Sequence, residues 1–309
     1  MADSEYLFSK TSYADIQAEF EKTIAWFGKY APGAFKRRFA LYRRDIAALV
    51  EAFNARKVDE LLKTRTTESL TNSMSEALEL GMIRKGLASL LGQDEELALR
   101  IRKTIKGPEY AKLEQTDIST NEPRNFAFEL VIAAYCAAAG YSIDLSEDAD
   151  LVFEDDGRKV FIECKRPASV KTIGTNVSRA LSQLTKRYDA AGFAGLKRGF
   201  VALSISKIIN REQRLLSVRT QAHLSKQLGS IVERFIRERE HSWQKALDIR
   251  TLGVIVYFNT AAIIEDQDLI VACRQVGLNN MTIRGTSDDL YFTEIGTKLQ
   301  QSMGALKKF

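Results

Sequence analysis

The stretch DADLVFEDDGRKVFIECKRP, from Asp148 to Pro167, decides the fold. Two runs with the alternating pattern of β-strands flank the dipeptide Asp156-Gly157. This dipeptide predicts a two-residue hairpin turn, because a type I′ turn needs positive φ at both central residues. The second run ends in Glu163-Cys164-Lys165, where a sheet normally buries apolar side chains. The charges there form either a structural ion pair or a functional site.

The predicted turn sets the register of the hairpin. Counting outward from it places Asp150 opposite Glu163, and Asp148 opposite Lys165. The β-carbons of opposed residues lie ~4.5–5.5 Å apart. On the other face we expect three apolar pairs in the core: Leu151 with Ile162, Phe153 with Val160, and Ala149 with Cys164. A slip of one residue would turn the charges into that core, so the pattern supports this register.

Two opposed carboxylates repel each other and destabilise a sheet unless something compensates. A divalent cation, a shared proton or a nearby base can do so. Mg²⁺ prefers carboxylate oxygens and keeps several waters of its own. Lys165 lies two residues after Glu163 and projects to the same side, where it can orient or deprotonate such a water. Acid, acid and lysine at this spacing predict a metal-dependent phosphodiesterase that uses Mg²⁺, for which Mn²⁺ can substitute.

The helix predicted before the hairpin contains one further carboxylate, Glu129, in the apolar run FAFELVIAAYCAAAG from Phe126 to Gly140. A buried carboxylate is costly without a partner. Two interpretations stay open. Glu129 is either protonated or paired with a base such as Arg124, or it faces the same metal as Asp150 and Glu163.

The helix predicted after the hairpin, from about Thr175 to Ala191, has a buried stripe and a polar face. Arg179 and Gln183 share that face at helical spacing and can meet a scissile phosphate. A solvated helix face explains the same pattern. The predicted contacts to nucleic acid are basic residues of this helix and of the chain just before it: Arg166, Lys171, Arg179, Lys186 and Arg187.

Together these residues resemble the PD-(D/E)XK superfamily of restriction-endonuclease-like nucleases. The resemblance covers residues 121–205 and rests on Glu129, Asp150, Glu163-Cys164-Lys165 and Gln183. It implies that Asp150 and Glu163 bind Mg²⁺ with the backbone carbonyl of Cys164, that Lys165 assists the attacking water, and that Glu129 completes the site. Two departures are that Ala149 stands where many members have proline, and that Gln183 and Tyr188 are spaced more widely than in the helicase-associated branch.

The resemblance implies an α/β fold with a restriction-endonuclease-like core, which is a mixed β-sheet flanked by helices, and an N-terminal all-helical region. Gly107-Pro108 breaks the helical pattern and suggests two regions, 1–107 and 108–309, the second with a C-terminal α/β extension. The basic segment FKRRFALYRR, from Phe35 to Arg44, is either a solvated helix face or a phosphate contact.

Bulk composition agrees with this interpretation without deciding it. The 309 residues carry a net charge of +5, which fits an acidic partner such as DNA. The three cysteines are far apart and the two histidines lie in polar sequence, so neither set predicts a metal site or a disulfide framework. Without an apolar span or a secretion signal, we expect a cytoplasmic protein that does not enter membranes.

The leading hypothesis is therefore a metal-dependent nuclease, acting most plausibly on DNA, in restriction or antiviral defence. A second hypothesis is a catalytically silent subunit of the same fold that binds nucleic acid or scaffolds a complex. A third makes the charges structural ion pairs of an unrelated α/β protein, which is disfavoured because buried ion pairs rarely add stability. The N-terminal helices are expected to dimerise, grip nucleic acid or dock a partner protein.

Overall fold

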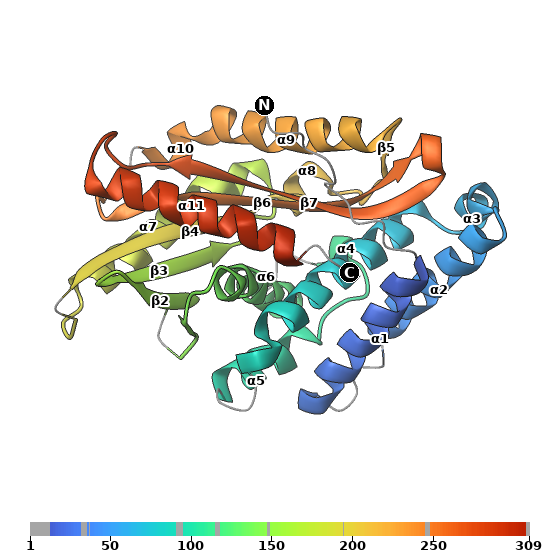
Figure 1. Cartoon of the computed structure of the whole chain (residues 1–309), viewed down its shortest axis with the longest axis horizontal. Helices are drawn as coiled ribbons and strands as arrows, with labels where there is room; N and C mark the ends of the chain where they lie inside the picture. The colour runs from blue at the N-terminus through green and yellow to red at the C-terminus, as the bar shows by residue number, and fades with distance from the viewer. Residues whose placement is uncertain are drawn as a thin grey trace.

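The computed structural model describes residues 13–31, 36, 38–90, 95–114, 118–146, 149–193, 195–244 and 248–306. They form a mixed α/β protein whose seven-stranded sheet is flanked by helices (Figure 1). The predicted mixed sheet with flanking helices is thus confirmed. No helix within these ranges is long and apolar enough to cross a membrane.

The N-terminal third is helical, as predicted. Its α-helices are α1 (Tyr13–Tyr30), α2 (Arg38–Asn54), α3 (Val58–Thr64), α4 (Thr67–Leu87) and α5 (Glu95–Thr104). The Ser/Thr-rich stretch from Thr64 to Ser75 predicts a connection that ends in a helix cap, and the cap is present although the connection is shorter than expected. Most of it belongs to α4, because the Thr66 side chain caps the helix by accepting a hydrogen bond from the Ser69 amide at 3.2 Å.

The sheet has the strand order β1-β2-β3-β4-β6-β5, and β7 pairs with β6 outside this path. Strands β1, β2 and β3 are antiparallel, β3 and β4 are parallel, and β6 is parallel to β4 and β5. The strands are β1 (Ile143–Asp144), β2 (Leu151–Asp155), β3 (Arg158–Lys165), β4 (Leu196–Ser204), β5 (Leu216–Val218), β6 (Thr251–Ile264) and β7 (Leu269–Asn280).

Helices connect and cover these strands. They are α6 (Ile118–Ala138), α7 (Ile173–Asp189), α8 (Ser206–Ile209), α9 (Gln221–Arg239), α10 (His241–Gln244) and α11 (Ser287–Leu306), with short 3₁₀ turns η1 (Ala88–Leu90), η2 (Ala111–Leu113), η3 (Val170–Thr172) and η4 (Glu265–Gln267). An early proline favours a helix that starts near Pro123, but helix α6 begins at Ile118. The helical pattern of the sequence runs from about Ala222 to Leu247, whereas α9 ends at Arg239.

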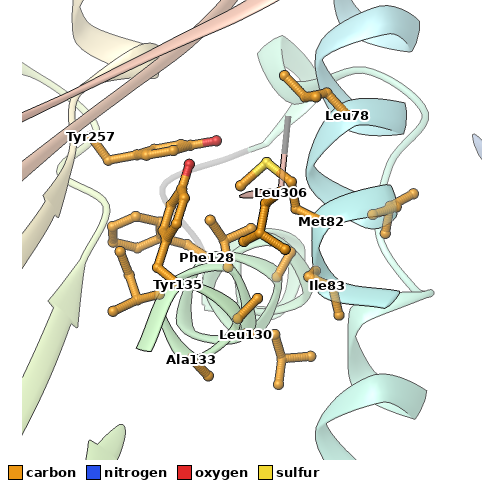
Figure 2. Close-up of a cluster of buried hydrophobic side chains, with 14 of the residues drawn as sticks. Leu78, Met82, Ile83, Phe128, Leu130, Ala133, Tyr135, Tyr257 and Leu306 are labelled. Atoms are coloured by element: carbon orange, nitrogen blue, oxygen red, sulfur yellow. The ribbon is translucent and has the colours of Figure 1, made fainter. Parts of the chain in front are cut away.

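Hydrophobic clusters lie on both faces of the sheet. One contains the buried stripes of α7 and α9, and the other joins the N-terminal helices, α6 and α11 to the sheet. Figure 2 shows part of the second cluster, where Met82 of α4, Phe128 of α6 and Tyr257 of β6 come together. Helices α4 and α6 approach closely, since a β-carbon on Gly86 would lie 2.6 Å from the Ala134 β-carbon. The sheet therefore has two covered faces.

A buried chain of ion pairs joins the helical region to the sheet. We call it the interface network, and it consists of Arg38, Glu76, Arg124, Glu114, Arg166 and Lys207. Arg38, from the basic segment of α2, is fully buried and lies 3.4 Å from Glu76. Arg43 and Arg44 of that segment are exposed. This network and the shared core both contain residues from before and after residue 107. The division into two domains at that residue stays a prediction.

Candidate active site at the hairpin

The predicted hairpin register is confirmed from Leu151 to Asp155. Leu151 pairs with Ile162, Phe153 with Val160, and Asp155 with Arg158, all antiparallel. The turn residues Asp156 and Gly157 have φ values of 48° and 67°, as the turn requires. The sequence places two residues with positive φ between the strands, and this local preference fixes which side chains face each other.

Just before β2 the chain bends, and this bend changes the orientation of two residues. Asp150 lies outside the strand ladder, and its Oδ2 accepts a hydrogen bond of 2.7 Å from the backbone amide of Cys164. Ala149 was expected to share the core with Cys164, and this was wrong. It packs in the cluster on the α7 side with Val152 and Phe161, because alternation is lost at the bend. The bend holds the Asp150 carboxylate against the end of β3.

Lys165 joins the two acids. Its Nζ lies 3.1 Å from Glu163 Oε2 and 3.6 Å from Asp150 Oδ2. Glu163 is completely buried, and its other oxygen, Oε1, lies 3.2 Å from the Arg187 guanidinium of α7. The structure thus brings Asp150, Glu163 and Lys165 together, as the spacing predicts, and adds Arg187.

Glu129 also lies at this site, but its basic partner is not the expected one. Arg124 is committed to Glu76 and Glu114 in the interface network. Glu129 Oε2 instead lies 3.0 Å from Arg100 of α5, which also donates to the backbone carbonyls of Asp150 (2.5 Å) and Leu145 (2.8 Å). We call the six side chains the hairpin cluster: Arg100, Glu129, Asp150, Glu163, Lys165 and Arg187.

Arg100 was missed by the sequence interpretation, although a signal exists. On α5 it shares the buried face with Leu97, Ile101 and Thr104. An arginine in the apolar stripe of an amphipathic helix must find a buried partner. That position in EELALRIRKT could have marked Arg100 as a residue of the interior.

The acids and bases of the hairpin cluster are equal in number, but the acids lie close together. Burial, reinforced by the neighbouring Asp150 carboxylate, raises the pKa of Glu163 in spite of Lys165 and Arg187. The same two causes raise the pKa of Glu129 to about 8, against the effect of Arg100. Burial lowers the pKa of Lys165, but Asp150 and Glu163 more than offset this and raise it overall. Burial and the closeness of the acids therefore make it costly to ionise all three together.

The remaining predicted residues are distributed as follows. Gln183 lies one turn before Arg187 on α7, and its Oε1 is buried without a hydrogen-bond partner. Arg179, Lys186 and Lys171 are exposed. Arg166 projects into the interface network, 3.4 Å from Glu114. Asp148 lies outside the described residues.

The donor set can be tested against the predicted Mg²⁺. Within the described part of the chain, no three acidic, histidine or cysteine side chains come close enough to hold a metal ion together. Asp150 and Glu163 supply two carboxylates, and Mg²⁺ is commonly held by one or two carboxylates while keeping several waters. Burial raises the pKa of Glu163 and the Asp150 carboxylate adds to this, so a cation between the two carboxylates would offset their repulsion. These two residues fit a hydrated Mg²⁺, whereas the participation of Glu129 and the Cys164 carbonyl stays a prediction.

Comparisons with known proteins give no independent identification. The chain matches no protein-family model, no curated protein and no solved structure. The functional interpretation consequently depends on the residues of the site and their geometry.

Proposed function

We propose that the protein is a metal-dependent nuclease that hydrolyses phosphodiester bonds, most plausibly of DNA, with the hairpin cluster as its active site. The observation that carries the proposal is the position of Lys165 Nζ within 3.6 Å of both Asp150 and Glu163 at the end of β3. Two carboxylates with a lysine at their centre can hold a hydrated cation and orient a water beside it.

Each residue has a defined role in this proposal. Asp150 and Glu163 hold Mg²⁺, which supplies charge neutralisation at the phosphate and a more acidic water when bound. Lys165 directs the attacking water through hydrogen bonds. The Asp150 carboxylate is fixed by the Cys164 amide, so its position does not depend on the cation. Arg187 fixes the opposite side of Glu163.

The arrangement around the site also supports a nucleic-acid substrate. Arg179 and Lys186 are exposed on α7, the helix that supplies Arg187. Exposed basic residues beside a phosphodiesterase site provide contacts to the phosphate backbone. A role in restriction or antiviral defence is part of the proposal and is consistent with a nuclease of this kind.

One observation favours the silent-subunit hypothesis. Glu129 and Glu163 each contact a base, and Lys165 contacts both Glu163 and Asp150. Charges paired in this way can remain buried without a metal ion and stabilise the fold of a binding subunit. Cleavage assays and metal titration separate the two functions, because a silent subunit binds nucleic acid without cutting it.

The decisive experiment incubates the purified protein with supercoiled, linear and single-stranded DNA and with RNA, in the presence of Mg²⁺ or Mn²⁺. We expect Glu163→Gln and Lys165→Met each to lower cleavage at least about 100-fold, because each removes a group that acts on the reacting atoms. Removing the divalent ion with a chelator should have the same effect.

The matched control is Glu154→Gln, which changes an exposed carboxylate on the same hairpin, opposite Lys159. It should cleave like the parent, and circular dichroism should show all three variants folded. The nuclease proposal fails if the parent cuts none of the four substrates, or if Glu163→Gln retains the parent's rate.

A further inference from the structure

A second polar site lies on the other side of the end of β3. It is a cavity of about 270 Å³ between α4 and the carboxyl ends of the parallel strands β3 and β4. Arg166 directly follows Lys165 in the chain, yet it lines this cavity, whereas Lys165 belongs to the hairpin cluster. In sheets with parallel strands, ligands bind outside the carboxyl ends of the strands.

The inner wall of the cavity carries polar atoms that lack partners. Thr71 Oγ1 and Asn259 Oδ1 are buried and have no hydrogen-bond partner, although the two residues are only 2% and 7% exposed. Ser75 Oγ and Gln213 Oε1, which also line the cavity, are in the same state. Buried polar atoms without partners are costly and rare. Hydroxyls and amide oxygens in this arrangement would accept hydrogen bonds from a ligand rich in O–H or N–H groups.

The charge around the cavity is positive on balance, because five bases line it together with three acids, Glu76, Glu79 and Glu114. Arg124, Arg166 and Lys207 lie within 3.4 Å of one carboxylate, that of Glu114. Lys112 and Arg211 also line the cavity and are exposed. Basic groups in this arrangement attract an anion. Phosphate suits them best, because it accepts several charge-assisted hydrogen bonds.

The lining also restricts the kind of molecule that fits. Among the described residues that surround the cavity there is no aromatic ring, and the apolar ones are Ala111 and Ala168. A nucleobase would lack a surface on which to stack. The volume is below the range of about 300–1,000 Å³ typical of drug-sized ligands, and far larger than one water needs. A small, strongly polar molecule matches both restrictions.

We propose that this cavity binds a sugar phosphate, with its hydroxyl groups toward Thr71 and Asn259 and its phosphate toward Arg211 and Lys207. Neither the hairpin cluster nor cleavage activity is needed for this binding. The inference and the proposed function can therefore fail separately.

The test is calorimetric titration of the full chain, without divalent metal, with ribose 5-phosphate, glucose 6-phosphate, ribose, inorganic phosphate and adenosine monophosphate. We expect a sugar phosphate to bind at least about 10-fold more tightly than ribose or phosphate alone, because it engages both ends of the cavity. Thr71→Val and Arg211→Gln should each weaken binding about 3- to 10-fold, since each removes one hydrogen-bonding group.

Both variants should fold, because Thr71 Oγ1 has no partner to lose and Arg211 is exposed. The matched control is Thr293→Val on the exposed face of α11, which should bind like the parent. Three results would overturn the inference: no binding of any probe, equal binding of inorganic phosphate and sugar phosphate, or tightest binding of the mononucleotide. Unchanged binding by Thr71→Val would place the ligand elsewhere and would also overturn it.

Discussion

The interface network and the hairpin cluster contain the same kinds of side chain but differ in their electrostatics. In the network, burial alone raises the pKa of Glu76 and Glu114, but the neighbouring arginines more than offset it and the pKa of each is lowered. In the hairpin cluster, burial and Asp150 dominate, and the pKa values of Glu129 and Glu163 are raised. Both places bury acids with bases, yet only in the network do the bases outweigh the effect of burial on the pKa of the acids.

The difference follows from how close the acids are to one another, because Glu76 and Glu163 each contact two bases. Glu76 contacts two buried arginines, Arg38 and Arg124. Asp150 and Glu163 share Lys165, so their mutual repulsion remains. Acids whose bases outweigh the effect of burial suit a structural role, whereas closely placed acids of raised pKa are suited to a further cation. Substitution of matched residues in the two places tests this distinction.

The largest expected effect is in the interface network. Glu76→Gln should lower the free energy of unfolding by about 3–5 kcal/mol, because it leaves two buried arginines short of negative charge. Urea denaturation measures the change. Glu21→Gln is the control, since Glu21 pairs with Arg43 at the surface and such pairs contribute about 1 kcal/mol or less. Equal losses in the two variants would show that the network is not a special source of stability.

Sequence alone predicted the hairpin because its determinants are local. The Asp156-Gly157 turn and the alternation of apolar residues fix the register without reference to the rest of the chain. Strand β7 was not predicted, although it pairs with β6 along its whole length. The connection between them contains no glycine, and Asp268 provides the left-handed residue with φ of 49°. A turn of this kind lacks the usual sequence signal.

The acids of the site and Lys165 were also predicted from local spacing, while the contacts of Arg100 and Arg187 were not. Arg100 reaches Glu129 only because α5 packs against α6. Arg187 was assigned to nucleic acid but contacts Glu163, and Arg166 lines the second cavity. Long side chains of distant elements are selected by tertiary packing, which the pattern of one segment does not encode. The cavity itself joins separated segments of the chain and was invisible for the same reason.

A smaller change in the free energy of unfolding is expected at Glu79, next to the interface network. Burial and the neighbouring Glu76 raise the pKa of Glu79 to about 7, against the effects of nearby Asn259 and Arg166. A raised pKa in the folded state means that the folded protein binds more protons than the unfolded chain between about pH 4.3 and 7. Stability from this group is therefore complete below about pH 4.3 and is lost as the pH rises toward 7.

The variant Glu79→Gln removes this titration. At pH 8 we expect it to be more stable than the parent by on the order of 2 kcal/mol, and at pH 5 the difference should be much smaller. Urea denaturation at both values measures it. A variant that is destabilised equally at pH 5 and pH 8 would show that the Glu79 carboxylate is compensated in the folded protein, like that of Glu76.

The smallest change in stability is expected at Glu163, the counterpart of Glu76 in the hairpin cluster. Because its pKa is raised, the folded protein accommodates the ionised carboxylate less well than the unfolded chain does. A glutamine side chain has the shape of the neutral acid, so Glu163→Gln should change the free energy of unfolding in metal-free buffer by no more than about 1 kcal/mol. Added Mg²⁺ should raise the melting temperature of the parent but not of Glu163→Gln, since ligand binding stabilises only a protein that retains the site. A loss as large as that of Glu76→Gln, with no response of the parent to Mg²⁺, would make the hairpin cluster a second structural network.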